Sequence, residues 1–246
     1  MSKTRQAKES VLVRFWAVDH HRTEIVSWPV NSWNKLVYAS DGVIQSESSS
    51  QFWVLPSCRA LWVHAGEEHR MKSLGKAKVR TLYFPSEFEI DRPRGPMVVS
   101  PLLKELIVEA SLHGPLFVGN MRHEALSTLL RIEIENADAF QTGVPMPRST
   151  WLYEWATRYL ESPHSESSNP FSGRTLARRM QEETGLSIGR WCYQARAVVG
   201  FRALSLGATV GEAASEAGYA TSSGFIQAFN KFFGTSPGKF RHHYHL

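Results

Sequence analysis

The sequence is poor in cysteine and lacks long apolar runs. Its two cysteines, Cys58 and Cys192, lie far apart and outside any C-x-x-C spacing. We therefore expect reduced thiols rather than a disulfide framework or a zinc site. No apolar run reaches the length of about 18 residues that a membrane-spanning helix needs. Residues 1–10 are polar and lack the apolar segment of a secretory signal, so we expect a cytoplasmic protein.

Sequence motifs of common enzymes are also missing. The chain has no G-x-S-x-G nucleophile motif, no phosphate-binding P-loop and no G-x-G-x-x-G dinucleotide motif. We therefore expect a protein that is not an enzyme and that carries no cofactor.

The composition is that of a folded protein whose C-terminal part is basic. The 246 residues are 42% hydrophobic and 21% charged, which is sufficient for two ordinary domains. The net charge is +5, and the residues from Arg148 onward contribute +4, with 11 lysines and arginines against 7 acidic residues. A basic part behind a nearly neutral one is typical of a protein that binds a polyanion.

Hydrophobic periodicity divides the chain into a β-rich part and a helical part. Short segments rich in β-branched and aromatic residues predict strands at 11–18, 35–39, 43–45, 52–55, 60–63, 69–73 and 79–84. Helical spacing predicts helices at 101–112, 123–135, 151–161, 174–184, 188–206, 211–217, 223–233 and 238–243. Residues 137–148 contain Gly143, Pro145 and Pro147, which predict an irregular linker. The pattern indicates an α+β multidomain fold with domains at 1–136 and 149–246.

Residues 209–241 carry the strongest local motif. Thr209 and Glu212 have the spacing of a capping box, which starts a helix. Ala213 and Ala214 give that helix a face of small residues that another helix can approach closely. Gly218 is expected to end it in a left-handed turn, which is inexpensive only for glycine.

The next helix of this motif is predicted to have one buried and one polar face. Thr221 or Ser222 caps it, and Phe225, Phe229 and Phe232 form its apolar stripe. Its other face carries side chains that suit base edges and phosphates, namely Ser222, Ser223, Gln227, Asn230 and Lys231. A short helix, a glycine turn and a second helix of this kind indicate a helix-turn-helix. On periodicity alone, a helical hairpin inside a bundle fits equally well.

Two longer runs decide between these interpretations by resemblance. The run G-Y-A-T-S-S-G-F-I-Q-A-F-N-K-F-F-G-T-S-P-G-K-F-R, residues 218–241, resembles the C-terminal signature of AraC/XylS-type transcriptional activators. The run S-G-R-T-L-A-R-R-M-Q-E-E-T-G-L-S-I-G-R-W, residues 172–191, resembles the recognition helix of the first of that family's two helix-turn-helix units. The resemblance spans 172–241 and implies that the chain regulates transcription by binding double-stranded DNA. It also implies RNA polymerase as a partner if the protein is an activator.

Carried over by position, the resemblance assigns roles to individual residues. Those expected to face bases are Arg174, Thr175, Arg178, Ser222, Ser223 and Gln227. The arginines suit guanine and the glutamine suits adenine. Those expected to contact phosphates, which position the protein without specifying a sequence, are Arg179, Arg190, Asn230, Lys231, Lys239 and Arg241. For any one of the arginines, a solvated surface charge is an equally simple interpretation.

The first unit departs from the family pattern. A helix of about ten residues normally precedes the first recognition helix in this family and supports it. Here the polar segment 162–173, with two prolines, leads directly into Arg174. We therefore predict that the supporting helix is shortened or replaced, which leaves the assignments of Arg174 and Arg178 less well supported than that of Gln227.

The β-rich part resembles the cupin-like sensory domains found in such regulators. The resemblance rests on L-V-Y-A-S-D-G-V-I, F-W-V-L-P-S-C-R-A-L-W-V-H-A-G-E-E-H-R and V-R-T-L-Y-F, and covers about residues 35–84. Metal-binding cupins carry an H-x-H ahead of these strands, where this chain has Pro29 and Asn31, so we expect no metal site. Six residues are candidates for an effector pocket, and the simpler alternative is a core: Trp33, Tyr38, Trp53, Trp62, His69 and Tyr83.

These observations predict a transcriptional regulator that responds to a small effector. The apolar faces of 101–112 and 123–135 exceed what a small barrel needs, so we also predict a homodimer through one or both of these helices. The alternative is that both helices pack back on their own barrel. Two alternatives stay open. One is a regulator remnant that acts through protein contacts without binding DNA by itself, and the other is a metal-dependent cupin enzyme.

Overall fold

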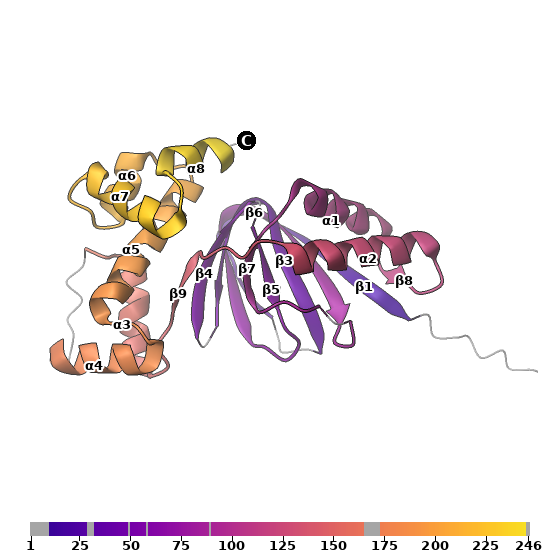
Figure 1. Ribbon diagram of the computed structural model, residues 1–246, viewed down its shortest axis with the longest axis horizontal. Coiled ribbons are helices and arrows are strands. Elements are labelled where there is room, and N and C mark those ends of the chain that lie inside the picture. Colours follow the sequence, from indigo (N-terminus) through magenta and orange to yellow (C-terminus); the bar gives the residue numbers. More distant parts are fainter. Residues whose placement is uncertain are drawn as a thin grey trace, which may run out of the picture.

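The structure is a computed structural model, and it describes residues 10–28, 32–48, 50–57, 59–88, 90–164 and 173–244. Figure 1 shows a curled antiparallel sheet with two helices in the first half of the chain and a group of helices in the second half. We call residues up to 136 the sheet part and residues from 149 onward the helical part. This two-part α+β arrangement is the one predicted. In the described residues, no helix combines the length and apolarity that crossing a bilayer requires.

In the described residues the sheet has nine strands. They are β1 (Val11–His20), β2 (Ile25–Trp28), β3 (Trp33–Glu47), β4 (Gln51–Pro56), β5 (Arg59–Val63), β6 (His69–Pro85), β7 (Gly95–Val98), β8 (Leu116–Phe117) and β9 (Gly143–Pro145). The main path runs β7-β5-β3-β6-β1-β8, while β2 pairs with β6, β4 with β3, and β9 with β4. All pairings are antiparallel. The two long strands β3 and β6 therefore form the centre of the curled sheet.

The sheet has an inner and an outer face, because side chains alternate along each strand. Val37, Leu61 and Val79 belong to a core on the inner face. Leu36, Trp62 and Leu82 are paired across β5, β3 and β6 and lie on the outer face. Two helices, α1 (Pro101–His113) and α2 (Met121–Asn136), cover this outer core. Ser100 and Asn120 cap their N-termini through side-chain oxygens.

The helical part contains α3 (Thr150–Glu161), α4 (Gly173–Thr184), α5 (Ile188–Ser205), α6 (Val210–Glu216), α7 (Ser222–Phe233) and α8 (Pro237–Tyr244). The long helix α5 is central, and Trp191 and Phe201 on it are fully buried. The core of this part continues into the sheet, where Phe52 and Val54 on the outer face of β4 join it. The two parts are therefore packed against each other through a shared apolar core.

The helix predictions are confirmed to within two residues at each end, whereas several strands differ. The segments predicted at 35–39 and 43–45 are one strand, β3, because irregular pairing near Asp41 and Gly42 bends the strand without ending it. The segments at 69–73 and 79–84 merge into β6 in the same way. Strands β2, β7, β8 and β9 were not predicted, because two to four residues carry too little periodicity.

The expectation that residues 137–148 are irregular throughout is wrong. Gly143–Pro145 forms β9 and pairs with Gln51–Trp53 of β4. A Cβ atom at Gly143 would overlap the carbonyl of Phe52, so glycine permits this close approach. Pro145 is tolerated because it lies at the end of a short strand on the sheet edge. The connection between the two parts is thus partly built into the sheet.

Candidate nucleic-acid interface

The predicted helix-turn-helix of α6 and α7 is present. The capping box at the start of α6 is complete, since Thr209 accepts from the Glu212 amide while Glu212 accepts from the Thr209 amide. Ala213, Ala214 and Ala217 are buried. Gly218 has a φ of +79°, the left-handed conformation predicted for the turn. Thr221, one of the two predicted caps, accepts a hydrogen bond from the Gly224 amide at the start of α7.

Helix α7 has the expected two faces. Phe225 and Phe229 are fully buried, and Phe232 is half-buried against the same core. The opposite face is exposed at every predicted DNA-contacting position, namely Ser222, Ser223, Gln227, Asn230 and Lys231. Gly234 ends the helix in a left-handed conformation at a φ of +68°. The buried phenylalanines fix the rotation of α7, and the polar face consequently points to solvent.

Close packing against α5 fixes the position of α7. A Cβ atom at Gly200 of α5 would overlap the ring of Phe225, so the absence of a side chain lets the two helices approach. Phe201 of α5 packs on Phe229 and Phe233, with ring centroids 6.4 and 4.8 Å apart. The exposed polar face of α7 is therefore held in place by α5, the longest of the described helices.

Arg196 of α5 supports the turn between α6 and α7, a role that the sequence did not indicate. Its Nε donates to the Ala217 carbonyl at 2.9 Å, and its Nη2 donates to the Gly218 carbonyl. The guanidinium also stacks over the Tyr219 ring, 3.9 Å from the centroid. Arg196 thus binds the carbonyl groups that the end of α6 leaves without intrahelical partners. A signal for this contact is absent from the local sequence, because the residues lie about twenty positions apart.

Helix α4 carries the candidate base contacts of the first unit. Leu176 and Met180 are buried, while Arg174 and Arg178 are exposed and Thr175 is half-buried. Arg178 is already engaged: its Nη1 donates to Glu182 at 2.8 Å. Arg179 lies 3.7 Å from the same carboxylate. Glu182 therefore neutralises part of the charge that the first unit presents to a polyanion.

Glu183 of α4 accepts hydrogen bonds from the residues that precede α3. Its Oε2 accepts from the backbone amides of Arg148 and Ser149, both at 2.8 Å, and its Oε1 accepts from the Ser149 hydroxyl at 2.8 Å. Burial raises the pKa of Glu183, but the hydrogen bonds from Ser149 and Arg148 outweigh it, so the pKa lies below its ordinary value. This anion at a helix N-terminus also interacts favourably with the dipole of α3.

The segment that precedes α4 was predicted to replace a supporting helix. The described residues of that segment, Ser162–His164, form no helix, and residues 165–172 lie outside the described part of the chain. His164 donates through Nε2 to the Ser215 carbonyl of α6, so the chain leaving α3 rests on the second unit. In the described residues, the support of α4 comes from α3 and α5.

The remaining candidate phosphate contacts lie on two helices, α5 and α8. Arg190 lies exposed in the first turn of α5, and Lys239 is exposed on α8. Arg241 on α8 is half-buried, and its Nε is buried without a hydrogen-bond partner. Of these three, Arg190 and Lys239 are accessible to a phosphate, and the positioning role assigned to all three remains a prediction.

The six candidate effector residues do not line one pocket. Tyr38 and Trp62 lie on the outer face of the sheet, in the core beneath α1 and α2. Trp53, His69 and Tyr83 lie on the inner face, where Lys35 pairs with Tyr83 across β3 and β6. Trp33 lines a separate cavity at the edge near β1. Pro29 and Asn31, at the positions compared with metal ligands, lie outside the described residues, and those described contain no cluster of three metal-ligating side chains.

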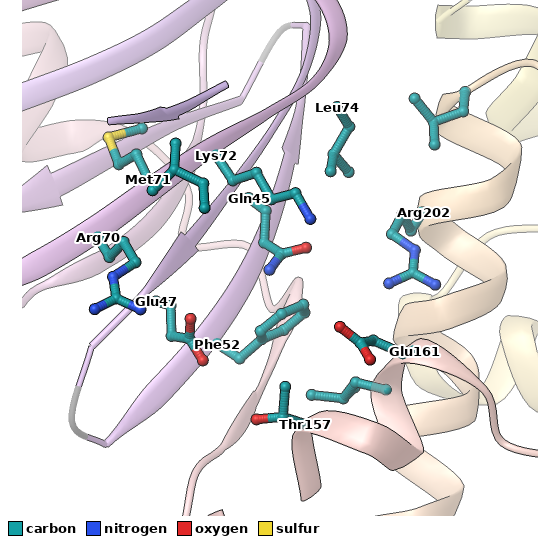
Figure 2. A pocket seen from close by; sticks show the side chains of 13 residues that line it. Gln45, Glu47, Phe52, Arg70, Met71, Lys72, Leu74, Thr157, Glu161 and Arg202 are labelled. Carbon is teal, nitrogen blue, oxygen red and sulfur yellow. The ribbon is translucent and has the colours of Figure 1, made fainter. Parts of the chain in front are cut away.

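A pocket of about 340 Å³ lies between the two parts. Figure 2 shows Gln45 and Lys72 extending from the sheet toward Arg202 on the helices, with Glu47 and Arg70 on the sheet side of the same pocket. Beside it, the Tyr153 hydroxyl of α3 donates to Glu47 of β3. The lining mixes both signs of charge with apolar side chains, so it favours no single class of ligand.

Both the C-terminal part and most of the whole chain are similar to known proteins. Residues 170–243 match a family model described as a helix-turn-helix domain. The HTH-type transcriptional regulator NimR of Escherichia coli (strain K12) is 25% identical over 231 residues, which cover 90% of this chain and 85% of NimR.

Solved structures also show similarity. The AraC-like transcriptional activator CuxR matches with a TM-score of 0.40 and 14% identity, covering 92% of this chain and 80% of CuxR. The DNA-binding domain of the transcriptional factor AdpA, solved in complex with a target DNA, matches with a TM-score of 0.33 and 25% identity. That match covers 37% of this chain and 86% of the AdpA domain.

Proposed function

We propose that this chain, whose residues 170–243 match a helix-turn-helix family model, is a sequence-specific transcriptional regulator of the AraC type that reads DNA through α7 and α4. The observation that carries the proposal is the geometry of α7. Phe225 and Phe229 bury one side completely, and Ser223 and Gln227 stand exposed on the other. A helix held in this way can enter a major groove with its polar side toward the bases.

The exposed residues divide into two kinds. Gln227 can donate to and accept from an adenine edge, and Arg174 can give a two-pronged contact to guanine. Lys231, one turn further along α7, has no such fork and suits a phosphate. Helix α7 contains no acidic residue that could compete with DNA for its polar side chains. In α4, by contrast, the ion pair between Arg178 and Glu182 has to break before Arg178 can contact a base.

A selection of binding sites from a random duplex library tests the proposal. The full chain should enrich a defined sequence, and Gln227→Ala should alter the preference at one position of it. Ile226→Val, at a half-buried neighbour on α7, is a matched control that should enrich the unchanged sequence. Failure of the full chain to enrich any sequence, at low as well as physiological salt, would refute sequence-specific binding.

We further propose that the protein acts as a homodimer through α2. This helix has a second apolar stripe, Met121, Ala125, Leu129 and Ile132, which is exposed and lies opposite the side that packs on the sheet. A helix with two apolar faces is typical of one that packs on two surfaces. Sedimentation should show a dimer at micromolar concentration, and Leu129→Glu should give a monomer while Lys104→Glu, at an exposed position of α1, should not. A monomeric wild-type protein would contradict the proposal.

A small effector bound by the sheet part is the third element of the proposed function. The shared core and the strand β9 connect the sheet to α3 and α5, so a change at the sheet can reach the recognition helices. The Nε1 of Trp191 on α5 donates to the Pro145 carbonyl of β9 at 2.7 Å, which adds a polar connection. The measurement is the change in affinity for the selected DNA when a ligand of the sheet part is added.

A further inference from the structure

A cavity of about 330 Å³ lies at the rim of the sheet, where β4, the segment leading into β7 and the connection before β9 meet. Two arginines, two glutamines and two aromatic residues line it: Arg92, Arg94, Gln51, Gln141, Trp53 and Phe140. The described lining contains no aspartate or glutamate. A pocket with cationic, amide and aromatic walls is chemically suited to an organic anion.

Arg94 has hydrogen-bonding capacity to spare. Its guanidinium stacks over Trp53, 4.9 Å from the ring centroid, and its Nε lies 3.1 Å from Glu67 Oε2. This approach to Glu67 is an ion pair without hydrogen-bond geometry, since Nε and Nη2 of Arg94 and Oε2 of Glu67 are all buried without a hydrogen-bond partner. Unsatisfied buried donors on a charged group are unfavourable. A carboxylate, accepted after a small rotation of the guanidinium, would supply the missing acceptors.

Arg92 adds a second buried cation to the same wall. It is 7% exposed, and its Nη1 donates to the Ile134 carbonyl at 2.9 Å and to that of Ala137. These carbonyl oxygens accept from Nη1 and carry no full charge, while Nε of Arg92 is buried without a hydrogen-bond partner. The exposed Asp138 is the acid that acts on Arg92 electrostatically. The wall of the cavity therefore carries two arginines with unsatisfied buried nitrogens, whose charge Glu67 and Asp138 offset in part.

The protein behind this wall is also electropositive. Lys35 and His69 on the inner face are both 2% exposed, and the Nε2 of His69 has no hydrogen-bond partner. Burial, with the positive charges of Lys35 and Arg94, lowers the pKa of His69 to about 4. His69 is therefore neutral at pH 7, while the surrounding cations favour an anion nearby.

The aromatic walls indicate the shape of the ligand and a route to the helical part. Trp53 and Phe140 both line the cavity, and each ring also packs against a guanidinium, that of Arg94 over Trp53 and that of Arg59 over Phe140. Phe140 also packs against Phe201 of α5 and Phe233 of α7, each with a centroid distance of 6.2 Å. A ligand that contacts Phe140 thus touches a residue of the core that positions α7.

We propose that this cavity binds a small organic acid with a planar apolar body, whose carboxylate is held by Arg94. The inference rests on the proposed function in one respect, because it supplies the effector through which the sheet part acts on the recognition helices. The expected ligand class is monoanionic and aromatic or conjugated, since the lining combines two arginines with the side chains of Trp53 and Phe140.

The test compares acids with their neutral amides on the full chain. Benzoate and benzamide, cinnamate and cinnamamide, and indole-3-acetate and indole-3-acetamide are titrated by calorimetry at up to millimolar concentration. At least one acid should bind, and its amide should bind at least about tenfold more weakly, because only the acid meets the guanidinium. Binding by none of the acids, or equal binding of acid and amide, would overturn the proposal.

Two arginine variants locate the site. Arg94→Gln should weaken the acid about tenfold or more, and Arg94→Lys should restore part of the affinity, since it keeps the charge without the fork. Arg80→Gln is the matched control, because Arg80 is also paired with one carboxylate, Asp19 at 2.8 Å, but lies away from the cavity. Circular dichroism confirms that each variant is folded. Unchanged binding by folded Arg94→Gln would refute this site.

A separate measurement distinguishes this inference from the proposed function. Without any acid, Arg94→Gln should bind the selected DNA as the wild type does, since it lies outside the recognition helices. Adding the acid should change the affinity of the wild type for DNA about fivefold or more and leave Arg94→Gln unaffected. Acid binding with no change in DNA affinity would overturn the role of the cavity as an effector site, while absence of DNA binding would overturn the proposed function alone.

Discussion

The two helix-turn-helix units differ in how they are held and in how freely they present their charge. The second unit, α6 and α7, has a complete capping box, a glycine turn, an arginine that binds the turn, and phenylalanines buried against α5. The first unit depends on α4, which buries only Leu176 and Met180 and is fastened to α3 by Glu183. One unit is therefore secured mainly by apolar packing and the other largely by hydrogen bonds to one carboxylate.

Because of this difference, we expect the two units to lose stability under different perturbations. Apolar packing is insensitive to mild acid and to salt, whereas hydrogen bonds to a carboxylate are lost when the carboxylate is protonated. The second unit should lose stability when a buried phenylalanine is removed from its core. The first unit should lose stability when Glu183 loses its charge.

The largest effect is expected from opening the core of the second unit. Phe229 is fully buried, and its ring lies 5.5 Å from that of Phe225 and 4.5 Å from that of Phe233. Phe229→Ala should lower the free energy of unfolding by about 3–5 kcal/mol, because it leaves a cavity. Chemical denaturation measures the loss, and Phe232→Ala, at a half-buried position, should cost clearly less. Equal costs at the two positions would show that α7 is rotated from the orientation described.

Removing the charge of Glu183 should affect the first unit alone. Glu183→Gln should cost about 1–2 kcal/mol, because charged hydrogen bonds to Ser149 and Arg148 become neutral or are lost. Hydrogen exchange should rise in α4 and not in α7. The exposed neighbour variant Glu182→Gln serves as the control and should leave the exchange of α4 amides unchanged.

The same interaction gives a pH dependence with a defined sign. Because the pKa of Glu183 is lower in the folded protein, its contribution is present above the unfolded value and is lost as the pH falls through the folded value. Hydrogen exchange of α4 should therefore increase from about pH 4.5 downward. If α4 and α7 lose protection together across that range, the two units are not separately held.

Two substitutions in α7 should have separate effects on DNA binding, one on specificity and one on affinity. Gln227→Ala should relax base preference at one operator position by about 1–3 kcal/mol and leave nonspecific binding almost unchanged. Lys231→Ala should weaken all sequences alike and reduce the salt slope by about one unit. Binding to a library of single-base operator variants at two salt concentrations measures both. Identical profiles for the two variants would mean that α7 does not lie in the groove as proposed.

The smallest effect should come from releasing the arginines of the first unit. Glu182→Gln removes the carboxylate that pairs with Arg178 and Arg179 on the exposed face of α4. Exposed ion pairs contribute about 0.2–1 kcal/mol, so DNA affinity should rise by no more than about fivefold, with a steeper salt dependence. Glu216→Gln, which frees Arg202 on a different surface, should change neither quantity. No gain from Glu182→Gln would indicate that α4 does not approach DNA.

The features predictable from the sequence are those that local chemistry determines. Thr209, Glu212 and Gly218 act within one or two helical turns, and the phenylalanine stripe of α7 repeats at helical spacing, so the second unit could be predicted nearly residue by residue. The roles of Glu183 and Arg196 could not, because their partners lie between about 20 and 35 positions away in the sequence. Nothing near either residue indicates such a partner.

The candidate effector pocket was harder to predict than the recognition helix for a related reason. Whether an aromatic residue faces inward or outward depends on its parity along the strand, and the irregular pairings in β3 change that parity. Tyr38 and Trp53 therefore lie on opposite faces although both belong to aromatic-rich strands. Arg92 and Arg94, which line the rim cavity, precede a short strand that carries no periodic signal.

The pairing of β9 with β4 bears on how such regulators can be recombined. Gly143 fits against the Phe52 carbonyl, and Trp191 holds the Pro145 carbonyl, so residues about ninety positions apart have to match one another. A gene fusion that joins the first half of one regulator to the second half of another within residues 137–148 separates partners that were selected together. A hybrid that also transplants residues 51–56 keeps them together. Exchange of parts between relatives should therefore succeed when β4 and β9 are exchanged together. A single crossover within residues 137–148 should give hybrids in which the sheet and the helices pack poorly.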